Sequence, residues 1–145
     1  MSMIGVLRSF QDDSFLTIDL DVDKAWHALS AITAPGPDPL HGIEHPDPLD
    51  PILGGREFGD DLGYGAARHL DPEQVRAVHV HLEALTDEQA RARFDPAAFT
   101  EAGIYPSMWD EADIWEADLA PNLHELRAFY AAAARAGEHV VLSLE

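Results

Sequence analysis

The sequence predicts a single α+β domain with a small sheet that includes the N- and C-terminal strands, packed with four to five helices. Short apolar runs at residues 3–9 ("MIGVLRS") and 139–144 ("HVVLSL") have the composition of strands. Helix-start signals and helically spaced apolar residues fill most of the chain between them. A length of 145 residues is that of one compact domain, so residues 1–145 are expected to fold together.

Alternating aspartates follow the first strand. Asp19, Asp21 and Asp23 lie two residues apart, so in an extended segment their side chains share one side. An EF-hand calcium loop starting at Asp19 requires glycine at its sixth position and glutamate at its twelfth, which here are Lys24 and Ser30. The calcium interpretation therefore fails, and the aspartates are expected to cap the helix that follows them.

That helix is expected from about Lys24 to Thr33, because Trp26, Leu29 and Ile32 recur at helical spacing. The next segment, Ala34 to Pro51, contains six prolines and two glycines, which exclude both a helix and a central strand. It is expected to be a loop wrapped over the surface.

Residues 52–70 contain five glycines among apolar and aromatic side chains, and are expected to form short strands joined by a tight loop. Asp71 and Pro72 then have the residue types of an N-cap and a first helical residue. The apolar stripe of this helix consists of Val75, Val78, Leu82 and Leu85.

Further helix starts follow in the second half. Thr86 and Gln89 have capping-box spacing, and Asp95 repeats the Asp-Pro start. Gly103 and Pro106 interrupt the helices before a last long one.

The last helix is expected to stop at Gly137, before the final strand. Its apolar face consists of Leu119, Leu123, Leu126, Tyr130 and Ala133. Residues 144–145, Leu-Glu, resemble a cloning junction before a purification tag and are not expected to contribute to function.

The composition excludes several classes of function. The chain has no cysteine, so thiol nucleophiles, thiolate zinc sites and disulfides are excluded. A formal net charge of −18 repels phosphate backbones and argues against nucleic-acid binding, while it permits a basic protein partner. The first ten residues lack a basic leader and their apolar run is too short for a signal peptide or a membrane span, so the expected location is the cytoplasm.

Several histidines are candidates for acid/base groups or metal ligands. His27 lies one turn after Asp23, so the two side chains are candidates for an acid/base pair, and the alternative is a partly buried structural histidine. His79 and His81, two residues apart on a helix, point to nearly opposite sides and cannot hold one metal ion. The loop residues with ligand chemistry are His41, Glu44, His45 and Asp47. A proline-rich loop offers them no framework, and no metal or other cofactor is predicted.

The stretch "GDDLGYGAAR" combines glycines that allow tight turning with the polar residues Asp61, Tyr64 and Arg68. It lacks the Walker pattern and the dinucleotide fingerprint, so it is not a phosphate loop. Two interpretations remain open: a structural hairpin with an Asp–Arg contact, and part of a polar site.

Three segments are expected to meet around one partly open polar pocket: the start of the first helix, the "GYG" loop and the "IYPSMW" turn. They hold the only lysine of the chain, two of its three tyrosines and two of its three tryptophans. The alternative is that the tryptophans belong to the core. The candidate pocket residues are Asp23, Lys24, Trp26, His27, Asp61, Tyr64, Arg68, Tyr105 and Trp109.

The motifs "DVDKAWHAL", "LGG", "GDDLGYGAARHL", "ARFDP" and "IYPSMWDE", in this order, resemble the YfbM-like family of small bacterial proteins, a domain of unknown function. The resemblance implies a single α+β domain in the bacterial cytoplasm and supplies no established activity. Relatives usually carry a longer, partly helical segment before "DKAW", whereas only Gln11 to Leu20 separate that motif region from the first strand here.

Two hypotheses for function follow. The first is a binding or interaction module. Its partner would be a basic protein, which an immunity-type protein masks, or a small polar ligand. The second is a small enzyme that uses Asp23, His27, Asp61, Tyr64 and Arg68, with His27 as general base and Arg68 as anion holder.

Overall fold

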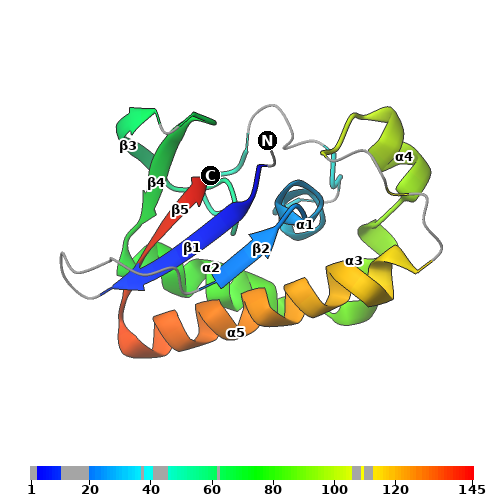
Figure 1. Ribbon diagram of the computed structural model, residues 1–145. Helices are drawn as coiled ribbons and strands as arrows, with labels where there is room; N and C mark the ends of the chain where they lie inside the picture. The colour runs from blue at the N-terminus through cyan, green and yellow to red at the C-terminus, as the bar shows by residue number, and fades with distance from the viewer. Residues whose placement is uncertain are drawn as a thin grey trace.

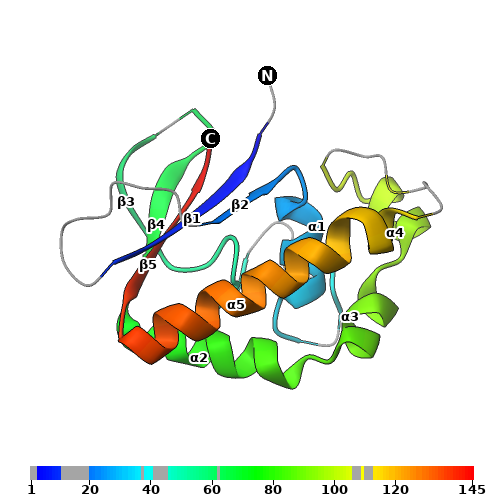
Figure 2. The same ribbon diagram turned by 60° about the horizontal axis from the view of Figure 1, so that its bottom comes forward.

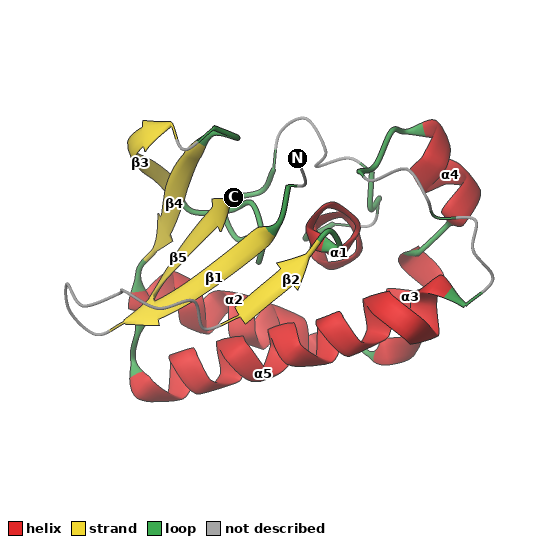
Figure 3. Cartoon of the chain, in the orientation of Figure 1, coloured by secondary structure: helices red, strands yellow, loops and turns green. Residues whose placement is uncertain are grey.

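The computed structural model describes residues 3–10, 20–36, 38–40, 46–61, 63–105, 109 and 113–145, which form a five-stranded antiparallel sheet packed with helices (Figures 1 and 3). The strands are β1 (Gly5–Phe10), β2 (Leu20–Asp23), β3 (Arg56–Asp61), β4 (Ala66–Leu70) and β5 (His139–Leu144). The helices are α1 (Trp26–Thr33), α2 (Pro72–Ala84), α3 (Asp87–Arg93), α4 (Pro96–Glu101), α5 (Ala120–Ala136) and a π-helical segment η1 (Trp115–Leu119). The predicted α+β class is confirmed.

The terminal strands lie side by side within the sheet. The strand order is β2-β1-β5-β4-β3, and β1 runs antiparallel to β5 from Gly5 opposite Leu144 to Phe10 opposite His139. Ile4 and Glu145 continue this ladder, because each backbone N–H donates to the carbonyl of the other, at 3.0 and 2.9 Å. The two terminal strands therefore pair with each other inside the sheet, and neither lies at its edge.

Helices α2 and α5 pack on each other and cover one face of the sheet (Figure 2). The predicted face of α5 is buried throughout, and α5 ends at Gly137, which has the left-handed conformation with φ 66°. The sheet contributes to the same core Leu7, Leu20, Val22, Leu70, Val140 and Leu142.

Local capping sets the start of three helices, as the sequence predicts. Asp71 and Gln74 form a complete capping box at α2, and Thr86 and Gln89 form another at α3. At α4 the Asp95 side chain accepts a hydrogen bond from the backbone of the first turn.

Helix α1 is buried on nearly all sides rather than along one stripe. Seven of its eight residues are buried, and His27 is the partly exposed one. Thr33 donates its hydroxyl to the Leu29 carbonyl at 2.6 Å, so this buried polar group is satisfied within the helix. In the described part of residues 34–51 the chain forms turns and no helix or strand, as its prolines predict.

Candidate functional site

The aspartates before α1 lie on the exposed side of the edge strand β2 and do not cap the helix. Residues of β2 alternate between buried and exposed, and Asp21 and Asp23 are the exposed ones. The N-cap of α1 is Ala25, which makes no side-chain capping bond, whereas Oδ1 of Asp21 accepts from the N–H of Asp23 at 2.7 Å. The capping prediction is wrong for both, because the pairing with β1 continues as far as Asp23, whose φ is 51°, and leaves a two-residue turn before the helix. Asp19 lies outside the described residues.

The charge of Asp23 acts on a second carboxylate from a distant part of the chain. Burial raises the pKa of Asp118 in η1, and the negative charge of Asp23 raises it further. Asn122 donates its side-chain N–H to Oδ1 of Asp118 at 3.0 Å. None of the ion pairs between described residues involves Asp21, Asp23 or Asp118. We call these three carboxylates the acidic edge.

Three of the predicted pocket residues form an aromatic cluster. The rings of Trp26 and His27 stack with centroids 4.7 Å apart and 9° between their planes, and Trp26 also stacks on Tyr105 at 5.8 Å. The N–H of Tyr105 donates to Nδ1 of His27 at 2.8 Å. The backbone of Met3 joins the cluster, since its N–H donates to the Tyr105 hydroxyl and its carbonyl accepts from the Trp26 indole.

This geometry assigns His27 a structural role in the cluster. A ring nitrogen that accepts a backbone N–H carries no proton, so the neutral ring keeps its proton on Nε2. Burial lowers the pKa of His27, which favours the same neutral form. The lone pair that a general base uses is thus occupied at Nδ1.

The two remaining candidates from these segments are Trp109 and Lys24. Trp109 is buried, donates its indole N–H to the Ile104 carbonyl at 2.9 Å and packs edge-on against Phe94. Lys24 is exposed and forms no ion pair within the described part of the chain.

The Gly-rich stretch forms the β3–β4 hairpin at the opposite edge of the sheet. Oδ1 of Asp61 accepts from the N–H groups of Gly63 and Gly65, so this carboxylate holds the turn around the half-exposed Tyr64. Arg68 lies in β4, where it is opposite Leu142 of β5. Strands β5 and β1 separate β4 from β2, a backbone distance of roughly 14 Å at ordinary strand spacing. The structure therefore does not bring Asp61 and Arg68 together with the acidic edge.

A buried carboxylate connects α1 with the end of the proline-rich loop, and the sequence does not single it out. Asp50 is fully buried; its oxygens accept from the Ser30 hydroxyl at 2.6 Å and from the N–H groups of Ile52 and Leu53. Burial raises the pKa of Asp50, while these hydrogen bonds oppose the rise. The available signal was Ser30, a polar residue within an apolar helix.

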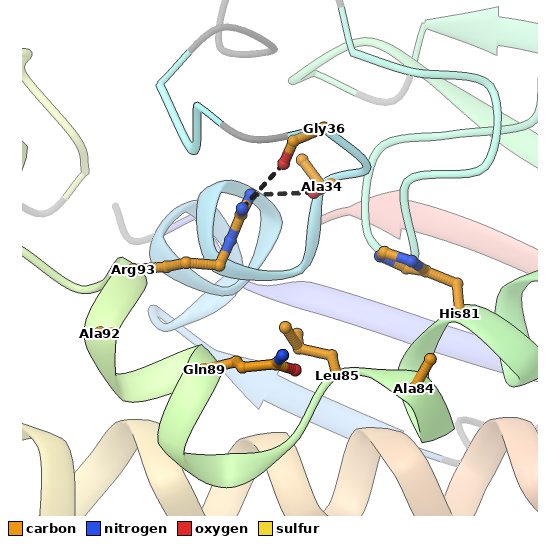
Figure 4. A pocket seen from close by; sticks show the side chains of 8 residues that line it. All are labelled: Ala34, Gly36, His81, Ala84, Leu85, Gln89, Ala92 and Arg93. Carbon is orange, nitrogen blue, oxygen red and sulfur yellow. Dashed lines mark hydrogen bonds between the residues drawn. The ribbon is translucent and has the colours of Figure 1, made fainter.

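A cleft of about 420 Å³ opens where the end of α1 meets α2 and α3 (Figure 4). We call it the Arg93 cleft; it is lined by Ala34, Gly36, His81, Ala84, Leu85, Gln89, Ala92 and Arg93. The guanidinium of Arg93 spans the C-terminal end of α1: Nε donates to the Ile32 carbonyl at 2.7 Å, Nη1 to Gly36 at 2.8 Å and Nη2 to Ala34 at 2.9 Å. Arg93 thus caps helix carbonyls that lack partners within the helix. The sequence offered no signal for this cleft beyond the residue types.

A second, wider hollow of about 610 Å³ lies between α2 and α5 and is lined in part by Arg76, His79 and Arg135. Because His81 faces the Arg93 cleft instead, the two helix histidines point to different sides, as predicted. The described residues contain no group of three or more His, Asp or Glu side chains placed to hold a metal ion, and the loop candidates His41, Glu44 and His45 lie outside them. Asp47 of that set accepts from the backbone of Leu49.

No helix in the described ranges has both the length and the apolar character needed to cross a lipid bilayer.

Comparison with known proteins supports the fold and the predicted resemblance. Among curated proteins, none matches this chain. The chain is similar to the crystal structure of a protein of unknown function, YfbM from Escherichia coli, with a TM-score of 0.71 and 21% identity over 98% of this chain and 99% of that one. The family described as domain of unknown function DUF1877 matches residues 3–143. The chain belongs to this DUF1877 family.

Proposed function

We propose that this domain is a binding module whose acidic edge receives a basic group of a protein partner. The observation that carries the proposal is the repulsion between Asp118 and Asp23, which adds to burial in raising the pKa of Asp118, while neither carboxylate pairs with a described cation. Like charges held together cost stability, and an arginine or lysine of a partner relieves that cost on binding. The net charge of −18 favours the approach of a basic partner over a longer range.

The enzyme alternative has less support from the geometry. It requires a lone pair on His27, and Nδ1 of His27 already accepts the Tyr105 N–H. It also requires Arg68 within reach of that ring, and two strands separate β4 from β2. The binding module needs neither condition.

Affinity capture with matched variants tests the proposal. The test variant is D21N/D23N/D118N, in which the amides keep the side-chain oxygens that accept from Asp23 and Asn122. Its control is E57Q/D60N/E125Q, which removes three negative charges from exposed positions in β3 and α5 whose side chains form no ion pair with another described residue.

Wild type and control should retain the same basic protein from a lysate of the native host at low salt, and release it as the salt concentration rises. The acidic-edge variant should fail to retain it. Recovery of no basic protein by wild type, or equal loss with both variants, contradicts the proposal.

A further inference from the structure

The guanidinium of Arg93 lines the Arg93 cleft while most of its N–H groups are engaged by backbone carbonyls. Figure 4 shows the Arg93 side chain reaching along the cleft wall to the backbone at Ala34 and Gly36. Its Nε and both terminal nitrogens donate to carbonyls at the end of α1, so the edge of the fork is already engaged. A guanidinium with its edge engaged still stacks on planar π systems through its face.

Two other polar side chains of this cleft each keep one hydrogen-bonding group available. His81 donates from Nε2 to the Thr33 carbonyl at 2.6 Å, which makes Nδ1 of the neutral ring an acceptor. Gln89 uses its Oε1 to accept from the Thr86 N–H at 3.0 Å, which leaves its side-chain NH₂ as a donor. Neither group has a partner among the described residues, so the cleft offers one acceptor and one donor.

The rest of the lining is apolar and small. It consists mainly of alanine methyl groups and the side chain of Leu85. A cleft of about 420 Å³ is within the size range of sites for small ligands.

We propose that the Arg93 cleft binds an uncharged, planar heteroaromatic ring that carries a hydrogen-bond donor next to an acceptor, the chemistry of a nucleobase or a related lactam. The ring stacks on the guanidinium of Arg93, its donor meets Nδ1 of His81 and its acceptor meets the NH₂ of Gln89. A cationic ring is disfavoured by Arg93. An anionic one finds Nε and one N–H of each terminal nitrogen of Arg93 engaged by carbonyls, and meets a chain of net charge −18. This inference is independent of the acidic edge, which lies on β2 and η1.

Hypoxanthine is a suitable probe, because it is a neutral bicyclic lactam with an N–H beside its carbonyl. Its binding to ¹⁵N-labelled full-length protein is followed by changes in the amide signals of α2, α3 and the end of α1. Cyclohexanecarboxamide serves as a comparison compound, since it has a donor and an acceptor but no π face. Benzoate tests whether a planar anion binds instead.

The matched variants are Gln89→Glu and Gln74→Glu. Both glutamines accept a backbone N–H in a capping box, and glutamate fulfils that role equally, so both variants keep their helix starts. Only Gln89 lines the cleft, and its replacement by glutamate removes the free donor. A second variant, Ala92→Leu, fills the cleft from an exposed helical position.

The expected result is saturable binding of hypoxanthine with a Kd on the order of 1 mM, localised to the cleft. Gln89→Glu and Ala92→Leu should each weaken it about tenfold, and Gln74→Glu should leave it unchanged. The proposal is overturned if hypoxanthine gives no saturable change up to its solubility limit. It is also overturned if cyclohexanecarboxamide or benzoate binds as tightly, or if the two glutamine variants behave alike.

Discussion

The backbone N–H of Tyr105 donates to Nδ1 of His27 across 2.8 Å, and so couples the turn after α4 to the first residues of α1. Protonation of His27 turns Nδ1 into a donor and places a charge in a half-buried site. Burial of the ring holds the pKa of His27 below its ordinary value of 6.5 in the folded protein.

Stability should fall as the pH drops, and His27 should account for part of that fall. The unfolded chain binds a proton at His27 near pH 6.5 and the folded chain binds it only at lower pH. The contribution of His27 is thus complete above about pH 6.5 and is lost as the pH falls toward the folded pKa. The variant His27→Asn keeps an acceptor for Tyr105 and does not titrate. Its free energy of unfolding, measured by urea denaturation between about pH 7 and about pH 5, should fall less than that of wild type; equal falls contradict the assignment.

Asp50 should tolerate an amide far better than a methyl group. In Asp50→Asn, Oδ1 still accepts from the N–H groups of Ile52 and Leu53, and the new NH₂ donates to the Ser30 hydroxyl. Because burial raises the pKa of Asp50, removal of its charge should leave stability at neutral pH unchanged or increased. Asp50→Ala orphans these buried donors and should cost about 2 kcal/mol or more. Denaturant unfolding of the two variants checks this, and similar losses in both would show that the side chain serves only to fill space.

Gly54 should not accept a side chain. A Cβ at this position would lie 2.5 Å from the carbonyl oxygens of both Asp50 and Pro48, which belong to the backbone and cannot rotate away. Gly54→Ala should therefore lower the free energy of unfolding by roughly 1–3 kcal/mol. Gly103→Ala is a useful comparison, because a Cβ there meets no atom within 4 Å and the cost arises from its positive φ of 74° alone. A neutral Gly54→Ala variant would mean that the loop can move away from the clash.

The sequence predicted the helix starts because capping is local. Asp71, Thr86 and Asp95 each bond to backbone within three residues, so the residue types and their spacing contain all the information. The strands at the chain ends were also predictable, because their composition is distinct. The sequence predicted that these two strands share one sheet. It did not predict that β1 and β5 pair with each other, with β2 on one side and β4 on the other.

The roles of the candidate site residues depend on contacts that spacing does not contain. Asp21 and Asp23 suit a helix N-terminus and an exposed strand edge equally well, and pairing with β1 decides for the strand. His27 receives its hydrogen bond from a residue 78 positions later in the chain. Arg93 caps a helix that ends some 60 residues before it, at carbonyls with no sequence signature. Only tertiary structure assigns these partners.

The capping role of Arg93 should make it sensitive to a substitution that keeps its charge. Lysine has no planar fork and cannot span the carbonyls of Ile32, Ala34 and Gly36 at once. Arg93→Lys should cost about 1–3 kcal/mol in urea unfolding. The exposed Arg76→Lys is the matched control and should change stability by less than about 0.5 kcal/mol. Equal effects of the two changes would remove the capping role.

Asp118 should lower stability at neutral pH, because burial and the charge of Asp23 both disfavour its ionised form. Its folded pKa is raised above 3.8, so the folded state disfavours the ionised carboxyl, and the penalty is complete above the folded pKa. Asp118→Asn keeps the acceptor for Asn122 and removes the charge. It should therefore raise the free energy of unfolding at pH 7 by less than about 1 kcal/mol, which thermal unfolding detects as a higher midpoint. The gain over wild type should disappear as the pH is lowered through the folded pKa to below about 3.8, whereas the exposed Glu125→Gln should show no such gain. If Asp118→Asn is more stable and also loses the basic partner, the repulsion at the acidic edge is a cost retained for binding; a destabilised Asp118→Asn would show instead that the carboxylate supports the fold.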